Sequence, residues 1–129
     1  MPLKSQLQIM VVDDMSVSRG LIEQGLDEIG LSKVQYEADG ASAYSRLVAA
    51  PVHLVISDMN MPGMDGLSLL EALRGHKVTQ NIGFILITGK ATKEIIMRGQ
   101  KAGMNNFIPK PFTNQQLLAS IEAVTGKLQ

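Results

Sequence analysis

The stretch 54–66 constrains the fold more than any other part of the sequence. Residues 54–56 form an apolar, mostly β-branched run, which has the length of a buried strand and is too short for a helix. The Pro-Gly pair at 62–63 can form a turn but cannot continue a strand, and Asp65 stands where a helix N-cap is expected. The stretch therefore predicts strand, loop and helix, with Asp58 at the carboxyl end of the strand, where open α/β sheets bind ligands.

The rest of the chain alternates in the same way between short apolar runs and helical periodicity. We expect strands at 9–12, 34–38, 54–56, 84–87 and 106–108. We expect helices that begin near Ser16, Asp39, Asp65, Lys93 and Thr113 and end near Gly30, Pro51, Gly75, Gly103 and Gly126. An inward stripe of Leu21, Ile22, Leu26 and Ile29 is predicted for the first helix, and Gly99 predicts a soft fourth helix.

Nearly pure apolar strands are typical of parallel sheets that helices cover on both faces. Because parallel crossovers are right-handed, five strand–helix units favour a doubly wound sheet. We therefore predict an α/β fold, a doubly wound (βα)5 three-layer sandwich with a five-stranded parallel sheet. The strand order 2-1-3-4-5 is expected partly by analogy with known sheets of this kind. The 129 residues are expected to form one domain.

Composition excludes several classes of function. Basic and acidic residues number 12 each, so there is no overall basic field for nucleic acid. The absence of cysteine excludes a disulfide scaffold, a thiolate nucleophile and zinc-finger spacing. The start of the chain lacks the apolar core of a signal peptide, and no apolar run approaches the roughly 20 residues of a membrane span. We expect a cytoplasmic protein.

Polar residues follow four of the predicted strands, and parallel strands deliver them to one edge of the sheet: Asp13 and Asp14, Asp58, Thr88 and Lys110. Alone, each of them reads as an ordinary capping, loop or solvated residue. Together, three carboxylates at one edge need a cation, and a hard cation with oxygen ligands such as Mg²⁺ fits. A carboxylate with a metal, a lysine and a hydroxyl beside it is equipped to form an aspartyl phosphate.

The chain resembles a two-component response regulator receiver domain, and within that family the chemotaxis regulators of the CheY type. The resemblance spans essentially the whole sequence, and the segments that carry it are 11–14, 57–67, 87–89 and 110–112. It implies that Asp58 accepts a phosphoryl group from a phosphohistidine on a sensor kinase. The chain would then be a signalling protein rather than an enzyme, catalysing only its own phosphorylation and dephosphorylation.

The resemblance also implies roles for single residues. Asp14, Asp58 and the backbone carbonyl of Asn60 would bind Mg²⁺ directly, and Asp13 would bind it through water. Thr88 and Lys110 would contact the phosphoryl group, and Lys110–Pro111 would be a cis peptide bond, the kind of bond for which cis costs little. Asn60, Gly89 and Lys90 would modulate the reaction.

Two residues depart from the CheY pattern, and a third is expected to loosen the fourth helix. Phe107 stands at the switch position where CheY proteins typically have tyrosine, Lys90 is basic where they are often acidic, and Gly99 lies inside the fourth helix. Phe107 can rotate between exposed and buried positions, but it has no hydroxyl to fix either one. We therefore expect Thr88 and Phe107 to act as a partial switch of the face formed by the fourth helix, fifth strand and fifth helix.

The partners implied by the resemblance are a CheA-like histidine kinase phosphotransfer domain and a flagellar switch protein or another output protein. Neither nucleic acid nor a membrane is expected as a partner, and the chain is expected to be a monomer. A stand-alone regulator is favoured over a phosphate sink or a receiver fragment of a larger regulator. Two remote alternatives are a flavodoxin-like flavin binder, whose phosphate the first acidic pair would repel, and a Mg²⁺-dependent phosphohydrolase, which would need a second acid/base near Asp58.

Overall fold

A computed structural model describes residues 3–129 and contains ten alternating elements. The strands are β1 (Gln8–Val12), β2 (Lys33–Glu37), β3 (Leu54–Asp58), β4 (Gly83–Thr88) and β5 (Asn106–Pro109). The helices are α1 (Ser16–Ile29), α2 (Gly40–Ala49), α3 (Gly66–Arg74), α4 (Lys93–Ala102) and α5 (Asn114–Thr125). The predicted elements are therefore confirmed in type and order, with boundaries that differ by a few residues at most.

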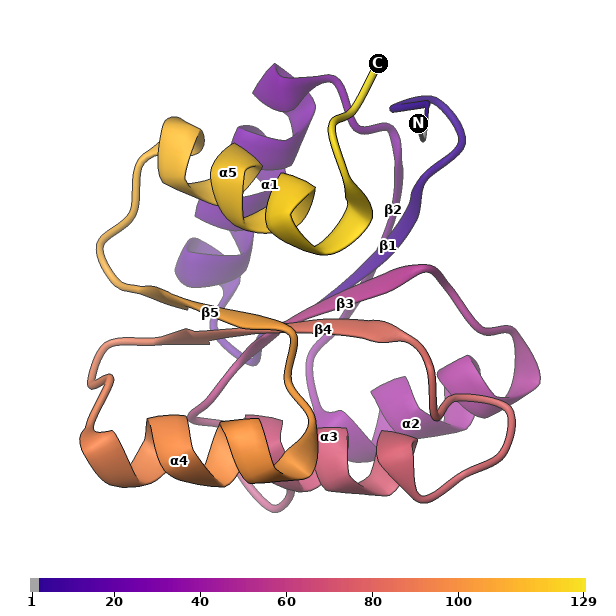
Figure 1. The fold of residues 1–129 in the computed structure, drawn as a ribbon, viewed down its shortest axis with the longest axis vertical. Coiled ribbons are helices and arrows are strands. Elements are labelled where there is room, and N and C mark those ends of the chain that lie inside the picture. Colours follow the sequence, from indigo (N-terminus) through magenta and orange to yellow (C-terminus); the bar gives the residue numbers. More distant parts are fainter. Residues whose placement is uncertain (1–2) are drawn as a thin grey trace.

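The five strands form one parallel sheet in the order β2-β1-β3-β4-β5, as predicted (Figure 1). The register aligns Val12 of β1 with Ser57 of β3, and Thr88 of β4 with Pro109 of β5. The carboxyl ends of β1, β3, β4 and β5 consequently share one edge. Every residue of β3 is buried, which explains why this central strand has no alternating polar face.

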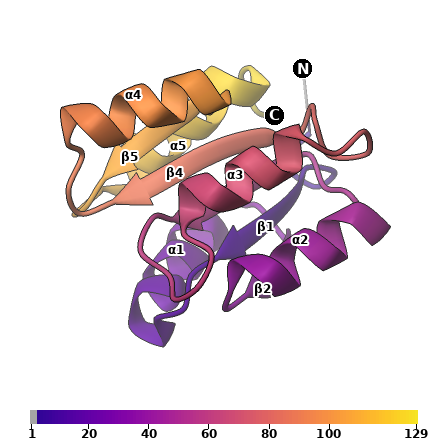
Figure 2. The same cartoon turned by 90° about the horizontal axis from the view of Figure 1, so that it is seen from below.

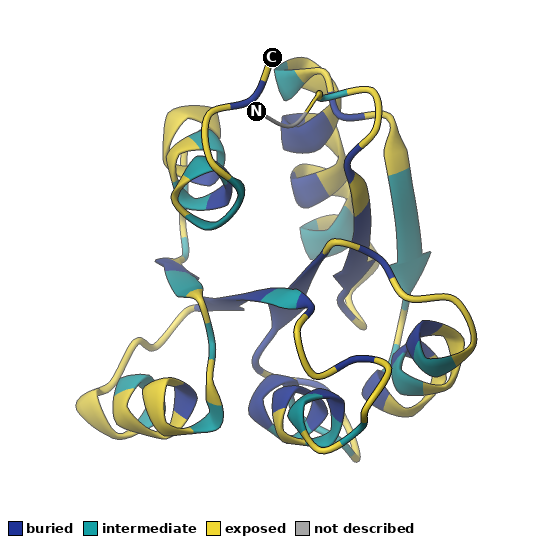
Figure 3. Cartoon of the chain, turned by 45° about the vertical axis from the view of Figure 1, so that its right-hand side comes forward, coloured by how far each residue is buried: buried dark blue, intermediate teal, exposed yellow. Residues whose placement is uncertain are grey.

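Helices cover both faces of the sheet: α1 and α5 lie on one side, and α2, α3 and α4 on the other (Figures 1 and 2). Successive residues of β1 divide between the two sides. Met10 and Val12 join the cluster under α2 and α3, whereas Ile9 and Val11 join the cluster under α1 and α5. The burial pattern in Figure 3 follows this arrangement: the three inner strands β1, β3 and β4 are almost entirely buried, the edge strands β2 and β5 are mostly intermediate, and the outer faces of the helices are exposed. The three-layer α/β sandwich is therefore the observed architecture.

Side-chain caps fix where most of the helices begin. Asp39, Asp65, Thr92 and Thr113 each accept a hydrogen bond from a backbone N–H in the first turn of their helix. The first helix differs: it begins at Ser16, as expected, but its N-cap is Met15, which provides no side-chain hydrogen bond. The backbone N–H of Met15 instead donates to Asp13 Oδ1 at 3.0 Å, so an acidic residue of the strand end anchors this helix.

One side-chain prediction was wrong, and one glycine has a packing role that the sequence did not indicate. Leu21 was expected in the inward stripe of α1 but is 60% exposed, whereas Ile22 and Leu26 are fully buried. Gly99 is not merely a weak point of α4. It is buried, and a Cβ at this position would overlap the sulfur of Met104. The glycine therefore lets Met104 pack against the helix, a purpose that helical propensity alone does not reveal.

Two arginines tie α3 to α4. Arg98 on α4 pairs with Glu71 at 2.9 Å and with Asp65 at 3.4 Å, and it donates to Ser68. Arg74 at the end of α3 donates to the carbonyl oxygen of Gly103, just after α4, and to the carbonyl oxygen of Ile82. Each helix therefore contributes one cation to the contact between them.

Two expectations include Met1 and Pro2, which lie outside the described residues: the domain boundary at residue 1 and the lack of a signal peptide at the start of the chain. Within residues 3–129, no helix is both long enough and apolar enough to span a membrane.

Candidate functional site

The predicted polar residues gather at the carboxyl edge of the sheet. Asp13 and Asp14 follow β1, Asp58 ends β3, and Thr88 ends β4. Lys110 follows β5, and its backbone N–H donates to the carbonyl oxygen of Thr88 at 2.8 Å. The strands β1, β3, β4 and β5 are consecutive in the sheet. The five side chains at their ends, which range from Asp13 to Lys110 in the sequence, therefore meet in one region.

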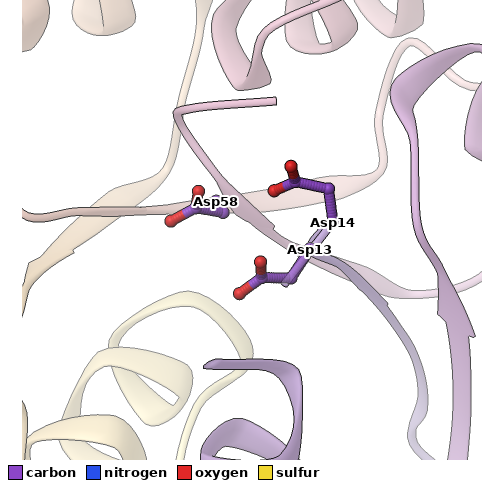
Figure 4. Close-up of side chains that lie close together, drawn as sticks. All are labelled: Asp13, Asp14 and Asp58. Carbon is purple, nitrogen blue, oxygen red and sulfur yellow. The ribbon is translucent and has the colours of Figure 1, made fainter. Parts of the chain in front are cut away.

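Three carboxylates form the centre of this region. Asp13, Asp14 and Asp58 each offer an oxygen atom, and these atoms all lie within 4.8 Å of one another (Figure 4). Asp13 and Asp58 are buried, whereas Asp14 is exposed. Like charges this close repel one another unless a cation joins them. Carboxylate oxygens together with an exposed, water-accessible side suit a hard divalent cation that keeps part of its water shell.

Asp13 carries a further sign that the cluster is incomplete by itself. Its Oδ1 accepts a hydrogen bond from the backbone N–H of Met15, but its buried Oδ2 has no hydrogen-bond partner among the described residues. Arg19 donates to the backbone carbonyl of Asp13 at 2.7 Å and so leaves that carboxylate oxygen unpaired. A buried carboxylate oxygen without a donor is costly, and a metal-bound water or a cation would satisfy it.

Among residues 3–129, Lys110 is the only cationic side chain that forms an ion pair with Asp58. Lys110 Nζ lies 2.6 Å from Asp58 Oδ1, and the backbone N–H of Asn60 donates to Oδ2 at 3.2 Å. Burial raises the pKa of Asp58, the hydrogen bond and charge of Lys110 lower it, and the charge of Asp13 raises it again. The net direction is upward, so the ion pair at 2.6 Å only partly offsets the cost of burying the carboxylate.

Lys110 has a second partner that the sequence reasoning missed. Its ammonium donates to Ser18 Oγ at 3.1 Å, in the first turn of α1. The only signal available in the sequence was that α1 begins at the same sheet edge as Asp13 and Asp14. The Lys110–Pro111 peptide bond is cis.

The hydroxyl of Thr88 lies in the same region but bonds elsewhere. It accepts a hydrogen bond from the backbone N–H of Lys90 and donates to the carbonyl oxygen of Lys90, both at 3.1 Å. Thr88 is buried, while Gly89 and Lys90 are exposed at the tip of the turn that follows β4. The structure therefore brings Thr88 to the site edge with its hydroxyl turned to its own loop rather than to a carboxylate.

The turn after β3 holds Asp58 in place through close backbone packing. The backbone N–H of Gly66 donates to the carbonyl oxygen of Met59 at 2.9 Å. A Cβ at Gly66 would lie 2.5 Å from the carbonyl oxygen of Asp58 and 2.9 Å from a methyl group of Leu86. Only glycine lets α3 begin this close to the end of β3, and Asp65 caps the helix one residue earlier.

Phe107 lies on the strand that leads to Lys110. It is partly buried, and it packs against the cluster under α2 and α3 that also contacts Ile95 and Met104. The next residue, Ile108, is buried in the cluster on the opposite side of the sheet. The alternation of β5 therefore directs Phe107 toward α4.

Comparison with known proteins agrees with this geometry. The model of the response regulator receiver domain matches residues 9–122. The chain is 36% identical to the probable chemotaxis protein CheY of Rhizobium etli over 129 residues, covering all of both chains. Chemotaxis protein CheY4 of Vibrio cholerae has a similar structure, with a TM-score of 0.85 and 27% identity over 93% of this chain and 99% of that one.

A third similar structure is the receiver domain of the sensor histidine kinase PA1611 from Pseudomonas aeruginosa, which was solved with a magnesium ion coordinated in its active site cleft. Its TM-score is 0.85, at 25% identity over 95% of this chain and all of that one. The acidic cluster of Asp13, Asp14 and Asp58 is consistent with a site of that kind. The chain therefore belongs to the response regulator receiver family, a family of signalling domains rather than conventional enzymes.

Proposed function

We propose that this chain is a phosphorylation-controlled switch in which Asp58 accepts a phosphoryl group from a phosphohistidine of a histidine kinase. The observation that carries the proposal is the placement of Lys110 Nζ 2.6 Å from a buried Asp58, beside two further carboxylates. Nucleophilic carboxylates, a positive charge and a candidate cation site together suit phosphoryl transfer, which depends mainly on positioning and on electrostatic stabilisation.

In the proposed reaction, an oxygen of Asp58 forms a bond to phosphorus while the phosphorus–nitrogen bond of the phosphohistidine breaks. The electron pair of that bond stays with the imidazole nitrogen of the kinase. Lys110 donates to the oxygens of the transferring group, on which negative charge is spread. Thr88 exchanges its hydrogen bonds with Lys90 for a hydrogen bond to a phosphoryl oxygen. Asn60, Gly89 and Lys90 surround the site and modulate how long the phosphoryl group stays.

The acidic cluster fits Mg²⁺, because three carboxylates converge and one buried oxygen of Asp13 lacks a donor. Asp14, Asp58 and the backbone carbonyl of Asn60 would hold the ion directly, and Asp13 would hold it through water. Bound Mg²⁺ supplies positive charge that offsets the charge of the carboxylates and of the phosphoryl oxygens. Asp13 also orients the start of α1, because its Oδ1 accepts a hydrogen bond from the backbone N–H of Met15.

Mg²⁺ should bind weakly, and Asp14→Ala should weaken binding more than Asp13→Ala. A direct carboxylate ligand contributes more than one that acts through water, so we expect a loss of about tenfold or more for Asp14 and a smaller loss for Asp13. NMR titration with Mg²⁺ measures both. Asp27→Ala, which changes an exposed acid on α1 outside the cluster, is the control. Equal losses for Asp13→Ala and Asp14→Ala would contradict the assignment of direct and water-mediated roles.

We further propose that the chain acts in chemotaxis or flagellar motor control. Full-length similarity at 36% identity to a protein named as a probable chemotaxis protein supports this role. The partners would be a CheA-like kinase phosphotransfer domain and a flagellar switch protein or another output protein. Residues 1–129 would act as a single receiver domain, monomeric and cytoplasmic, without nucleic acid or membrane as a partner. A phosphate sink and a receiver fragment of a larger regulator remain the alternatives.

Phosphotransfer from a panel of purified histidine kinases tests the proposal, combined with binding to a flagellar switch protein. A motor regulator should take phosphate rapidly from one kinase and bind the switch protein more tightly when phosphorylated. Rapid transfer without phosphorylation-dependent binding would favour the phosphate sink. No transfer from any kinase, and none from acetyl phosphate with Mg²⁺, would contradict the proposed function itself.

The switch would run from Thr88 to Phe107. Thr88 and Pro109 are register partners in adjacent strands, and Phe107 lies two residues before Pro109. When the hydroxyl of Thr88 turns toward the phosphoryl group, it vacates space that Phe107 is placed to fill. The face formed by α4, β5 and α5 would then change shape as a two-state element. Because Phe107 lacks a hydroxyl, we expect part of the population to be active-like before phosphorylation.

Beryllofluoride with Mg²⁺, which mimics a phosphoryl group on Asp58, should shift the NMR signals of α4 and β5. We expect changes across residues 93–102 and 106–109 as well as around Asp58. The same additions to Asp58→Asn serve as the control and should leave these signals unmoved. Changes confined to the residues that line Asp58 would show that Phe107 is simply a packed core residue.

A further inference from the structure

The ammonium of Lys110 is held between two side chains that come from different parts of the chain. It lies 2.6 Å from Asp58 Oδ1 and donates to Ser18 Oγ at 3.1 Å, across a separation of 92 residues in sequence. An ammonium has three N–H donors, so these two contacts leave one donor free. Lys110 is 29% exposed at its side chain, and the free donor can therefore reach a group that enters from solvent.

Ser18 is well placed to fix this position because the start of α1 is anchored to the acidic cluster. The backbone N–H of Met15 donates to the side chain of Asp13 at 3.0 Å. Arg19, next to Ser18, donates to the backbone carbonyl of Asp13 at 2.7 Å. Asp13 itself is fully buried at the end of β1. These two hydrogen bonds fix the start of α1, and with it Ser18, relative to Asp13.

The surroundings of Lys110 explain why such a contact matters. Lys110 and Ser18 both line a cavity of about 610 Å³ between α1 and the segment that leads into α5. The cavity wall also includes the exposed apolar side chains of Met15, Val17 and Leu21. A lysine has a flexible four-carbon stem, and this stem has room to turn into the cavity and away from Asp58. The hydrogen bond to Ser18 opposes that motion.

We infer that Ser18 is a positioning residue for phosphotransfer, and that its hydroxyl holds the ammonium of Lys110 where it meets the oxygens of the incoming phosphoryl group. The inference rests on the proposed function. Ser18 does not contact the reacting atoms; it acts through Lys110. Preorganising a charged donor before the reaction lowers the cost of stabilising the charge that develops in the transition state.

Ser18→Ala should slow phosphorylation of Asp58 by acetyl phosphate at saturating Mg²⁺ by about threefold to tenfold, as expected for one lost charge-assisted hydrogen bond acting through a neighbour. Ser18→Thr keeps the hydroxyl and should restore most of the rate. Ser16→Ala is the matched control, because Ser16 is an exposed serine in the same turn of α1. Its rate should equal that of the unchanged protein. Thermal melting of the three variants separates a rate effect from a loss of stability.

Lys110→Ala provides the second arm of the test. If Ser18 acts through Lys110, Ser18→Ala should have no further effect on the rate in the Lys110→Ala background. The ¹⁵N ammonium signal of Lys110 should also be visible in the unchanged protein and in Ser18→Thr, and should broaden by exchange with water in Ser18→Ala. An unchanged rate in Ser18→Ala, or an equal slowing with and without Lys110, would overturn the inference.

Failure of this inference can be told apart from failure of the proposed function. If Asp58→Asn loses phosphorylation and Lys110→Ala slows it, while Ser18→Ala has no effect, only the role of Ser18 is wrong. If Asp58→Asn is phosphorylated as well as the unchanged protein, the acceptor assignment is wrong and the role of Ser18 falls with it.

Discussion

Asp58→Asn is expected to abolish stable phosphorylation by phosphohistidine donors and by acetyl phosphate while leaving the fold intact. An amide oxygen is a much weaker nucleophile than a carboxylate, and no other carboxylate of the cluster is paired with Lys110. The fold should survive because the amide has almost the same shape and its oxygen can still accept from the backbone N–H of Asn60. Burial already raises the pKa of Asp58, so the neutral amide removes a desolvation cost.

Intact-protein mass spectrometry after incubation with acetyl phosphate and Mg²⁺ measures this loss, and thermal melting checks the fold. Asp65→Asn is the matched control, since it makes the same chemical change at the N-cap of α3, beyond the loop that follows Asp58, and Asn caps a helix as well as Asp does. The control should be phosphorylated normally. Labelling of Asp58→Asn at the level of the unchanged protein, stable to acid, would mean that the phosphoryl group resides on another residue.

Gly66→Ala is expected to damage both stability and phosphorylation, although Gly66 carries no functional group. The added methyl would lie 2.5 Å from the carbonyl oxygen of Asp58, and 3.1 Å from the Cα of Met59. Both are backbone atoms, which cannot rotate away as a flexible side chain could. Overpacking of this kind costs about 1–3 kcal/mol or more in the free energy of unfolding. Relief by displacing the end of β3 would move Asp58 relative to Lys110.

Urea denaturation of the unchanged protein and of Gly66→Ala measures the cost, and the rate with acetyl phosphate measures the displacement of Asp58. Gly20→Ala is the control, because Gly20 lies in α1 and a Cβ there meets nothing within 4 Å. That substitution should stabilise the protein by about 0.5–1 kcal/mol through helical propensity. Unchanged stability in Gly66→Ala would mean that α3 can start farther from β3 than the structure indicates.

The fold was predictable because its strongest determinants are local or periodic. Short apolar runs specified the strands, and caps such as Asp65 and Thr113 specified helix starts that the structure confirms. Parallel topology then brought the residues at the strand ends to one edge without any knowledge of side-chain contacts. For this reason the acidic cluster of Asp13, Asp14 and Asp58 could be expected from the sequence alone, and the structure has these residues together.

Contacts between distant segments were not predictable in the same way. Periodicity placed Leu21 inward because it is apolar, but the helix turns that position toward solvent. Gly99 looked like a helix weakness because its partner Met104 lies beyond the helix end. Hydrophobic periodicity also gave no indication that Ser18 contacts Lys110 or that Thr88 forms hydrogen bonds with Lys90. The partners of polar side chains at strand and helix ends depend on how the elements pack against one another.

The two arginines between α3 and α4 make the position of α4 sensitive to dissolved salt. Arg98 meets Glu71 and Asp65 on a solvent-exposed surface, where dissolved salt weakens ion pairs. Arg74 is bound to neutral carbonyl oxygens, including that of Gly103, on which salt has less effect. As ionic strength rises, α4 would therefore loosen at Arg98 while its carboxyl end stays tethered, and its motion would become that of a helix pivoting about one fixed end.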